Sequence, residues 1–232
     1  MSYNLLSSTE GAHPIKSYQA NSVGASHQIL QKSKKIRQNL PNTHNCAIFV
    51  TMGALGVNTG GYRKLKVYRK TEVIYDLTYY FCKKYLKLGD RTIDQMVQAA
   101  RSGKQNIVEG NEVAETSAET MLKLLGVARG SLQELLVDYE DYLRVRNLRL
   151  WADDSKEVSA MRNLGKEHED SAYFLELAQT RSDEVVANMV IVLIYQADTL
   201  LNGYIKRKYA DFLKEGGFRE KMTRERKRYR DE

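Results

Sequence analysis

The distribution of proline constrains the fold of this chain more than any other feature. Pro14 and Pro41 are the only two prolines, and residues 42–232 contain none. Proline breaks helices, so a long proline-free stretch rich in Leu, Ala, Glu, Lys and Arg favours helices over a turn-rich β-sandwich. Hydrophobic residues make up 42% of the 232 and charged residues 28%, as in globular proteins. We therefore expect an all-α fold.

The first 61 residues differ in composition from the rest. Ser, Asn, Gln, Gly and His dominate them, and a glycine-rich stretch covers 53–61. Such a segment buries too little apolar surface to fold, so we predict a disordered low-complexity tail over residues 1–61. Met52 is a second candidate start site. The glycine-rich stretch lacks the GxxxxGK[ST] order of a phosphate-binding loop.

Apolar residues recur at helical spacing in four long segments after the tail. We predict helices over about 64–88, 91–110, 117–147 and 182–214. Thr116 or Ser117 is placed to cap the third helix, and Ser182 to cap the fourth. Short connections favour antiparallel neighbours, so residues 62–216 are predicted to form an up-and-down four-helix bundle.

Two further segments complete the predicted organisation. An acidic segment at about 148–181 is inserted in the bundle, with short helices expected over 155–164 and 168–178. Gly216 and Gly217 end the fourth helix, and residues 217–232 form a basic C-terminal extension. Within the third helix, Gly126 and Gly130 lie four residues apart. We predict that these two glycines allow another helix to approach closely. The alternative is that they only lower the stability of the helix.

Positive charge is unevenly distributed along the chain. There are 36 Lys and Arg against 29 Asp and Glu, a net charge of +7. The excess lies in residues 1–61, 62–110 and 217–232, whereas 111–216 is net acidic. Clustered charge of this kind is typical of proteins that bind polyanions, and a basic surface that serves only solubility is the alternative.

Basic residues alternate with tyrosines in the first two predicted helices. Lys and Arg neutralise phosphates, and Tyr stacks on unpaired bases. For the tyrosines we favour packing on a second helix face, and a subunit interface is a further alternative. We predict these nucleic-acid-binding residues: Arg63, Lys64, Lys66, Arg69, Lys70, Lys83, Lys84, Lys104, Arg224, Arg226, Lys227 and Arg228.

Residues 98–110 are the most distinctive polar stretch of the chain. Spacings of three and four residues place several of its polar side chains on one helix face. We predict a hydrogen-bond network that fixes helix register, with a ligand site as the alternative. Its members are Gln98, Arg101, Gln105, Asn106 and Glu109, joined by Arg129 and Glu134 of the third helix.

The sequence carries no motif that requires an enzyme, a metal or another cofactor. Gly165 stands three residues before His168, so the Glu-x-x-His pattern of di-iron bundles is absent, and no GxSxG motif occurs. Cys46 and Cys82 match no CxxC spacing. The longest apolar run, residues 185–194, is half the length of a membrane span. We expect a non-enzymatic cytoplasmic protein without a membrane segment.

Several stretches are similar to one known family. They are LKVY at 65–68, RS at 101–102, NIVEG at 106–110 and ARGSLQEL at 128–135. These resemble the four-helix-bundle proteins also described as 23S rRNA intervening-sequence proteins. GGYRK at 60–64, MVQAARSGKQNI at 96–107, LVDYEDY at 136–142, RLW at 149–151 and DFLKEGGF at 211–218 resemble the branch with a four-helix-bundle suffix domain. The resemblance covers about residues 60–230.

The resemblance implies an up-and-down bundle that assembles as a homo-oligomer, pentameric in relatives. A more distant group, the accessory proteins of diversity-generating retroelements, works with a reverse transcriptase and binds nucleic acid through a basic surface. Gly103 departs from the family pattern, which has Ile at that position, and the C-terminal suffix bears on the pentameric interface. We expect an oligomer that binds RNA or DNA backbone. The alternatives are a protein-interaction scaffold and an enzyme with a site at 101–109.

Overall fold

The computed structural model describes residues 61–114 and 116–231. Over these residues the chain forms seven α-helices and one short 3-10 helix, with no β-strand, so the expected all-α class is confirmed. The predicted tail, apart from residue 61, lies outside the described residues. The elements are η1 (Gly61–Lys64), α3 (Lys66–Tyr85), α4 (Arg91–Val113), α5 (Ala118–Val145), α6 (Lys156–Glu167), α7 (Ser171–Gln179), α8 (Asp183–Glu215) and α9 (Phe218–Asp231).

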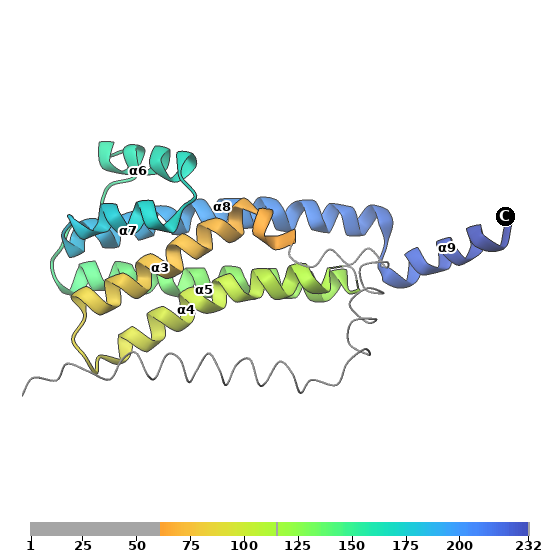
Figure 1. The fold of residues 1–232 in the computed structure, drawn as a ribbon, viewed down its shortest axis with the longest axis horizontal. Helices are drawn as coiled ribbons and strands as arrows, with labels where there is room; N and C mark the ends of the chain where they lie inside the picture. The colour runs from red at the N-terminus through yellow and green to blue at the C-terminus, as the bar shows by residue number, and fades with distance from the viewer. Residues whose placement is uncertain (1–60, 115, 232) are drawn as a thin grey trace, which may run out of the picture. The chain divides into compact units, whose positions relative to one another are not determined.

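The four long helices alternate in direction along the chain. In Figure 1, α3 and α5 run towards one end of the molecule, and α4 and α8 run towards the other. α3 packs on α4 and α8, and α5 packs on the same two helices, so the four close a ring around a common core. α7 covers α3, and α6 covers α8.

Side-chain caps define where several helices begin. The Ser117 hydroxyl accepts the backbone N–H of Thr120 at 3.2 Å, so Ser117 rather than Thr116 caps α5. Ser182 caps α8 as predicted, through the N–H of Val185. Each bond satisfies a donor that the first helical turn leaves open.

The predicted end of α4 is wrong by three residues. The helix continues through Gly110 to Val113, although Gly110–Asn111 looks like a stop signal. Gly110 is buried, and a Cβ there would lie 3.4 Å from the Met121 carbonyl oxygen of α5. This glycine serves the contact between helices, not the end of one.

α8 is the central helix, as its sequence predicts. Its residues from Val186 to Ile194 are all buried. By length and composition α8 also suffices to cross a membrane, with a mean hydropathy of 1.5 over its most apolar 18 residues. However, 61% of that window is buried inside the protein, as in the core helix of a globular fold.

Asn188 is the one buried amide in this apolar helix among the described residues. Its Oδ1 accepts the backbone N–H of Trp151 at 2.8 Å. Its Nδ2 donates to the carbonyls of Arg149 and Glu184 at 2.9 and 2.8 Å. Asn188 therefore ties the extended stretch before α6 to the core, which explains a polar residue in an otherwise apolar run.

The close helix approach lies at a different glycine from the predicted pair. Gly126 and Gly130 are exposed, and a Cβ at either would meet nothing within 4 Å in the described part of the chain. At Gly103 of α4, by contrast, a Cβ would lie 3.0 Å from the Leu132 side chain of α5. The predicted approach at Gly126 and Gly130 is wrong within this chain, because both point away from the core.

Candidate nucleic-acid interface

A row of tyrosines and lysines lines the exposed side of α3. Residues four apart lie above one another on a helix, so Tyr75, Tyr79 and Lys83 form one row and Tyr80 and Lys84 the next. With Asp76 and Leu175 of α7, they line an open surface hollow of about 600 Å³. We call this surface the lysine–tyrosine face, and add Lys104 of α4, which reaches Tyr75.

Each lysine of this face lies over an aromatic ring. The Nζ atoms of Lys83, Lys84 and Lys104 are 5.0, 5.2 and 4.4 Å from the ring centroids of Tyr79, Tyr80 and Tyr75. Such cation–π contacts hold the ammonium groups in place without neutralising their charge. The side chains of Lys83 and Lys84 are exposed, so their remaining N–H donors are available to phosphate oxygens.

Hydrogen bonds anchor one end of this face to α7 and to the residues before α8. Lys84 Nζ donates to Tyr80 Oη at 2.7 Å and to the Gln179 carbonyl at 3.2 Å. Tyr85 Oη donates to the Arg181 carbonyl at 2.8 Å. The tyrosines thus pack, as the sequence favoured, and at the same time they position cations.

The basic residues at the start of α3 differ in their exposure to solvent and in whether an acidic side chain offsets their charge. Arg63 lies over the Tyr62 ring at 5.7 Å, and Lys64 and Lys66 are exposed. Arg69 forms an ion pair with Glu169, which offsets its charge. The environment of each cation, which the sequence does not show, decides how much of the predicted charge reaches solvent.

Lys70 does not belong to the surface on which the sequence placed it. Its side chain is buried, and its Nζ donates to the Gly165 carbonyl of α6. Burial lowers the pKa of this ammonium, against a smaller opposite effect from Glu169. Lys70 is covered because its side chain extends towards Gly165 of α6 and Phe174 of α7, two segments far from it in the sequence.

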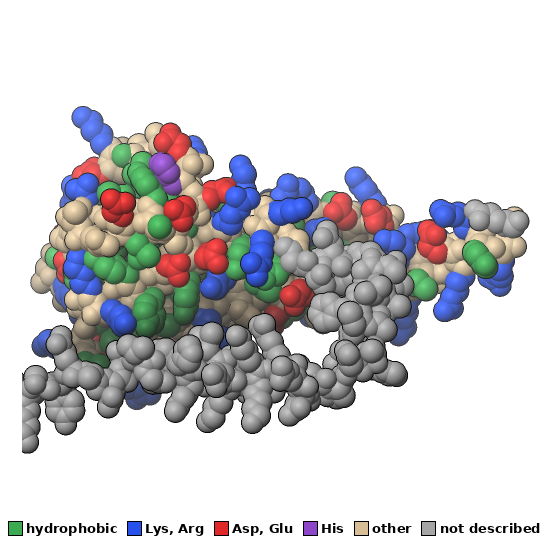
Figure 2. Space-filling model, in the orientation of Figure 1, with side chains coloured by type: hydrophobic (Ala, Val, Ile, Leu, Met, Phe, Trp, Pro, Cys, Tyr) green, Lys and Arg blue, Asp and Glu red, His purple; other side chains and the backbone are tan. Residues whose placement is uncertain are grey.

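α9 supplies the second group of candidate residues. It carries seven basic and three acidic side chains, and none of its residues is buried. Arg224 donates to the Glu215 carbonyl, and Arg228 lies 3.7 Å from Glu225. Arg226 and Lys227 are exposed. Figure 2 shows Lys and Arg side chains along this helix beyond the end of α8.

The polar residues of α4 do not form a single network. Arg129 pairs with Asp198 of α8, with Nε 2.7 Å from Oδ1. Among the described residues, no hydrogen bond links the remaining predicted members between α4 and α5; Gln98 and Glu134 line the same shallow hollow. These remaining members are Gln98, Arg101, Gln105, Asn106, Glu109 and Glu134.

The polar link between α4 and α5 runs through serines that the sequence analysis did not select. Ser131 Oγ donates to Ser102 Oγ at 3.0 Å, and Asn106 Nδ2 donates to the Ser102 carbonyl at 2.9 Å. Ser131 is buried, and small hydroxyls fit where the two helices are close. The signal that points to them is Gly103 beside Ser102.

No protein-family model, curated protein or solved structure matches this chain. Within residues 61–114 and 116–231, no group of three or more His, Cys, Asp and Glu side chains is placed to hold a metal ion.

Proposed function

We propose that this protein binds the RNA or DNA backbone without catalysing a reaction. The observation that carries the proposal is the lysine–tyrosine face, where three ammonium groups lie over tyrosine rings on one side of α3 and α4. Cations held in this way bind phosphates without first losing much side-chain freedom. The exposed basic helix α9 adds a second contact surface.

The proposal extends to the architecture and the assembly. We propose that α3, α4, α5 and α8 are the up-and-down four-helix bundle of the intervening-sequence protein family, which the sequence resembles. The alternating helix directions support this assignment. A cytoplasmic homo-oligomer follows from the same resemblance.

Salt-dependent binding tests the proposed function. We would measure fluorescence anisotropy of labelled RNA and DNA oligonucleotides with the full chain, from 50 to 200 mM salt. The slope of log affinity against log salt counts the neutralised phosphates, at about 0.7–0.9 per contact. Replacing Lys83, Lys84 and Lys104 by Gln should weaken binding and lower that slope by about 2–3.

A matched variant controls for the change in net charge. Lys123, Lys156 and Lys214 are exposed and lie outside the lysine–tyrosine face. Replacing these three by Gln removes the same charge and should leave the slope nearly unchanged. Equal losses in both variants, or no binding at 50 mM salt, would overturn the proposal.

A protein-interaction scaffold is the second candidate function, because α9 also has an exposed apolar row. Phe218, Met222 and Tyr229 are 48%, 38% and 83% exposed, and their spacing of four and seven places them on one face. Replacing the three by Ser separates the functions. The scaffold predicts loss of a salt-insensitive protein complex in a pull-down, whereas backbone binding predicts little change in oligonucleotide affinity.

A further inference from the structure

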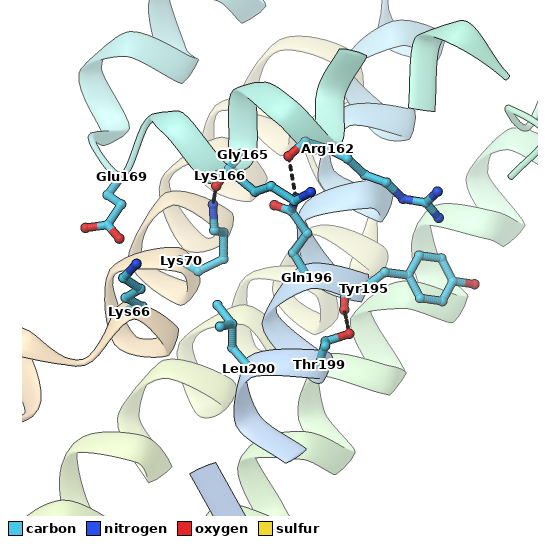
Figure 3. A pocket seen from close by; sticks show the side chains of 10 residues that line it. All are labelled: Lys66, Lys70, Arg162, Gly165, Lys166, Glu169, Tyr195, Gln196, Thr199 and Leu200. Carbon is cyan, nitrogen blue, oxygen red and sulfur yellow. Dashed lines mark hydrogen bonds between the residues drawn. The ribbon is translucent and has the colours of Figure 1, made fainter. Parts of the chain in front are cut away.

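Four of the ten residues that line a pocket between α3, α6 and α8 are cations. Its volume is about 400 Å³, in the range of small-molecule sites. Figure 3 shows the side chains that line it, with Lys70 pointing to the Gly165 carbonyl and Gln196 reaching the Arg162 carbonyl. The charged residues on its wall are Lys66, Lys70, Arg162, Lys166 and Glu169.

Lys70 lies in this pocket with little to balance its charge. The residue is 3% exposed, and within the described residues its only hydrogen-bond acceptor is the Gly165 carbonyl. The ring of Phe174, 6.0 Å away, adds a weak attraction. A buried ammonium has three donors and is costly unless it is paired. Two of its N–H groups have no partner among the residues that the structure describes.

The carboxylates around the pocket are already paired with arginines. Glu169 forms an ion pair with Arg69, and Asp153 forms one with Arg162. Three lysines therefore remain without a carboxylate within ion-pair distance in the described residues: Lys66, Lys70 and Lys166. A ligand that balances them carries about two or three negative charges, which exceeds a single carboxylate.

The rest of the pocket wall leaves room for an organic group. Gln196 Nε2 donates to the Arg162 carbonyl at 2.8 Å, and its Oε1 is buried against Gly165. Leu200 supplies apolar surface. The volume also exceeds that of a bare phosphate ion, which leaves room for a ring or a chain.

We propose that this pocket binds a small organic phosphate, a phosphate monoester such as a nucleoside monophosphate. A phosphate monoester carries a charge of about −1.5 to −2 at pH 7, and its three terminal oxygens match several lysine donors. Lys66 of α3 and Lys166 of α6 bind the phosphate, and the buried Lys70 adds a third positive charge. The inference is independent of backbone binding by the lysine–tyrosine face.

Calorimetric titration of the full chain with AMP tests this site. Lys66→Gln and Lys166→Gln, both at exposed positions, should each weaken AMP binding about tenfold. Lys156→Gln is the matched control, since Lys156 lies at the other end of α6 and does not line the pocket. It should leave the affinity unchanged. No AMP binding, equal losses in all three variants, or citrate binding as tight as AMP would overturn the proposal.

The phosphate monoester can come from a free nucleotide or from the 5′ end of a nucleic-acid strand. A short oligonucleotide with a 5′-phosphate is compared with the same strand ending in a 5′-hydroxyl. If the protein prefers the strand with the 5′-phosphate, and Lys166→Gln abolishes that preference, the strand end is the source. AMP binding without that preference identifies a free nucleotide. Because 5′-hydroxyl strands still report backbone binding, failure here is separable from failure of the proposed function.

Discussion

Gly165 lies where α6 packs closely on α8. A Cβ added there would overlap the Gln196 Oε1 and lie 3.0 Å from its Cδ. Gln196 would have to turn away and lose its bond to the Arg162 carbonyl. We expect Gly165→Ala to lower the free energy of unfolding by about 1–2 kcal/mol, despite the better helix propensity of Ala. Urea unfolding measures this change.

The effect of Gly165→Ala on stability should change sign when the Gln196 side chain is shortened. In a Gln196→Ala background the Cβ meets no glutamine, so Gly165→Ala should raise stability by about 0.5–1 kcal/mol through helix propensity alone. The two substitutions therefore form a double-mutant cycle. Gly165→Ala lowers stability in the wild-type background and raises it in the Gln196→Ala background. A similar loss in both backgrounds would show that something other than Gln196 fills the space beside Gly165.

Cys82 is a buried thiol with no chemical role in the proposed function. It is 1% exposed, and burial, followed by Asp138 and Asp90, raises its pKa to about 12. Since only the thiolate reacts, we expect no labelling of native Cys46→Ser protein by a thiol reagent at pH 8, and full labelling in urea.

The same thiol makes stability depend on pH. Because the folded state favours the protonated thiol, the contribution of Cys82 to the free energy of unfolding falls as pH rises from 9.0 towards 12.

At the scale of elements, Asn188 determines how the stretch before α6 joins α8. Asn188→Leu keeps the branched shape but removes the amide that bonds the Trp151 N–H and two carbonyls. We expect a loss of about 2–4 kcal/mol in urea unfolding, followed by the fluorescence of Trp151, the only tryptophan. Asn163→Leu, at an exposed position of α6, should stay within about 0.5 kcal/mol of wild type. Equal losses would contradict the bridging role.

Helix existence and caps were predictable from the sequence because they depend on local signals. Apolar spacing and the Ser117 and Ser182 hydroxyls lie within one or two turns of what they determine. The end of α4 was not predictable from local signals, since Gly110 makes a contact with a helix that begins eight residues later.

The candidate site was less predictable from the sequence, because it also depends on contacts between separate helices. The sequence placed Lys70 and Lys83 together as exposed cations, but the first is buried under α6 and the second lies in the lysine–tyrosine face. Arg129 pairs with Asp198, 69 positions further along the chain. Which cations stay free depends on contacts between distant segments, and residue spacing does not encode these directly.

At the scale of the whole molecule, the exposed glycines of α5 test whether this helix meets another copy. Without a neighbouring helix, Gly126→Ala with Gly130→Ala should raise stability by about 1–2 kcal/mol, because Gly costs a helix about 1 kcal/mol relative to Ala. We expect this gain in urea unfolding and an unchanged mass by light scattering. A lower mass would instead place a subunit contact at these glycines.

The length of α8 separates the Lys84 end of the lysine–tyrosine face from α9. Lys84 bonds to Gln179, just before α8 begins, and α9 starts just after α8 ends. At 1.5 Å per residue, the 33 residues of α8 span about 50 Å, several times the screening length of roughly 8 Å at physiological salt. Under the proposed function, the Lys84 end of the lysine–tyrosine face and α9 each meet a polyanion on their own, and a duplex shorter than roughly 15 base pairs does not reach from one to the other. Longer strands would engage both, and avidity would then make the affinity depend on nucleic-acid length.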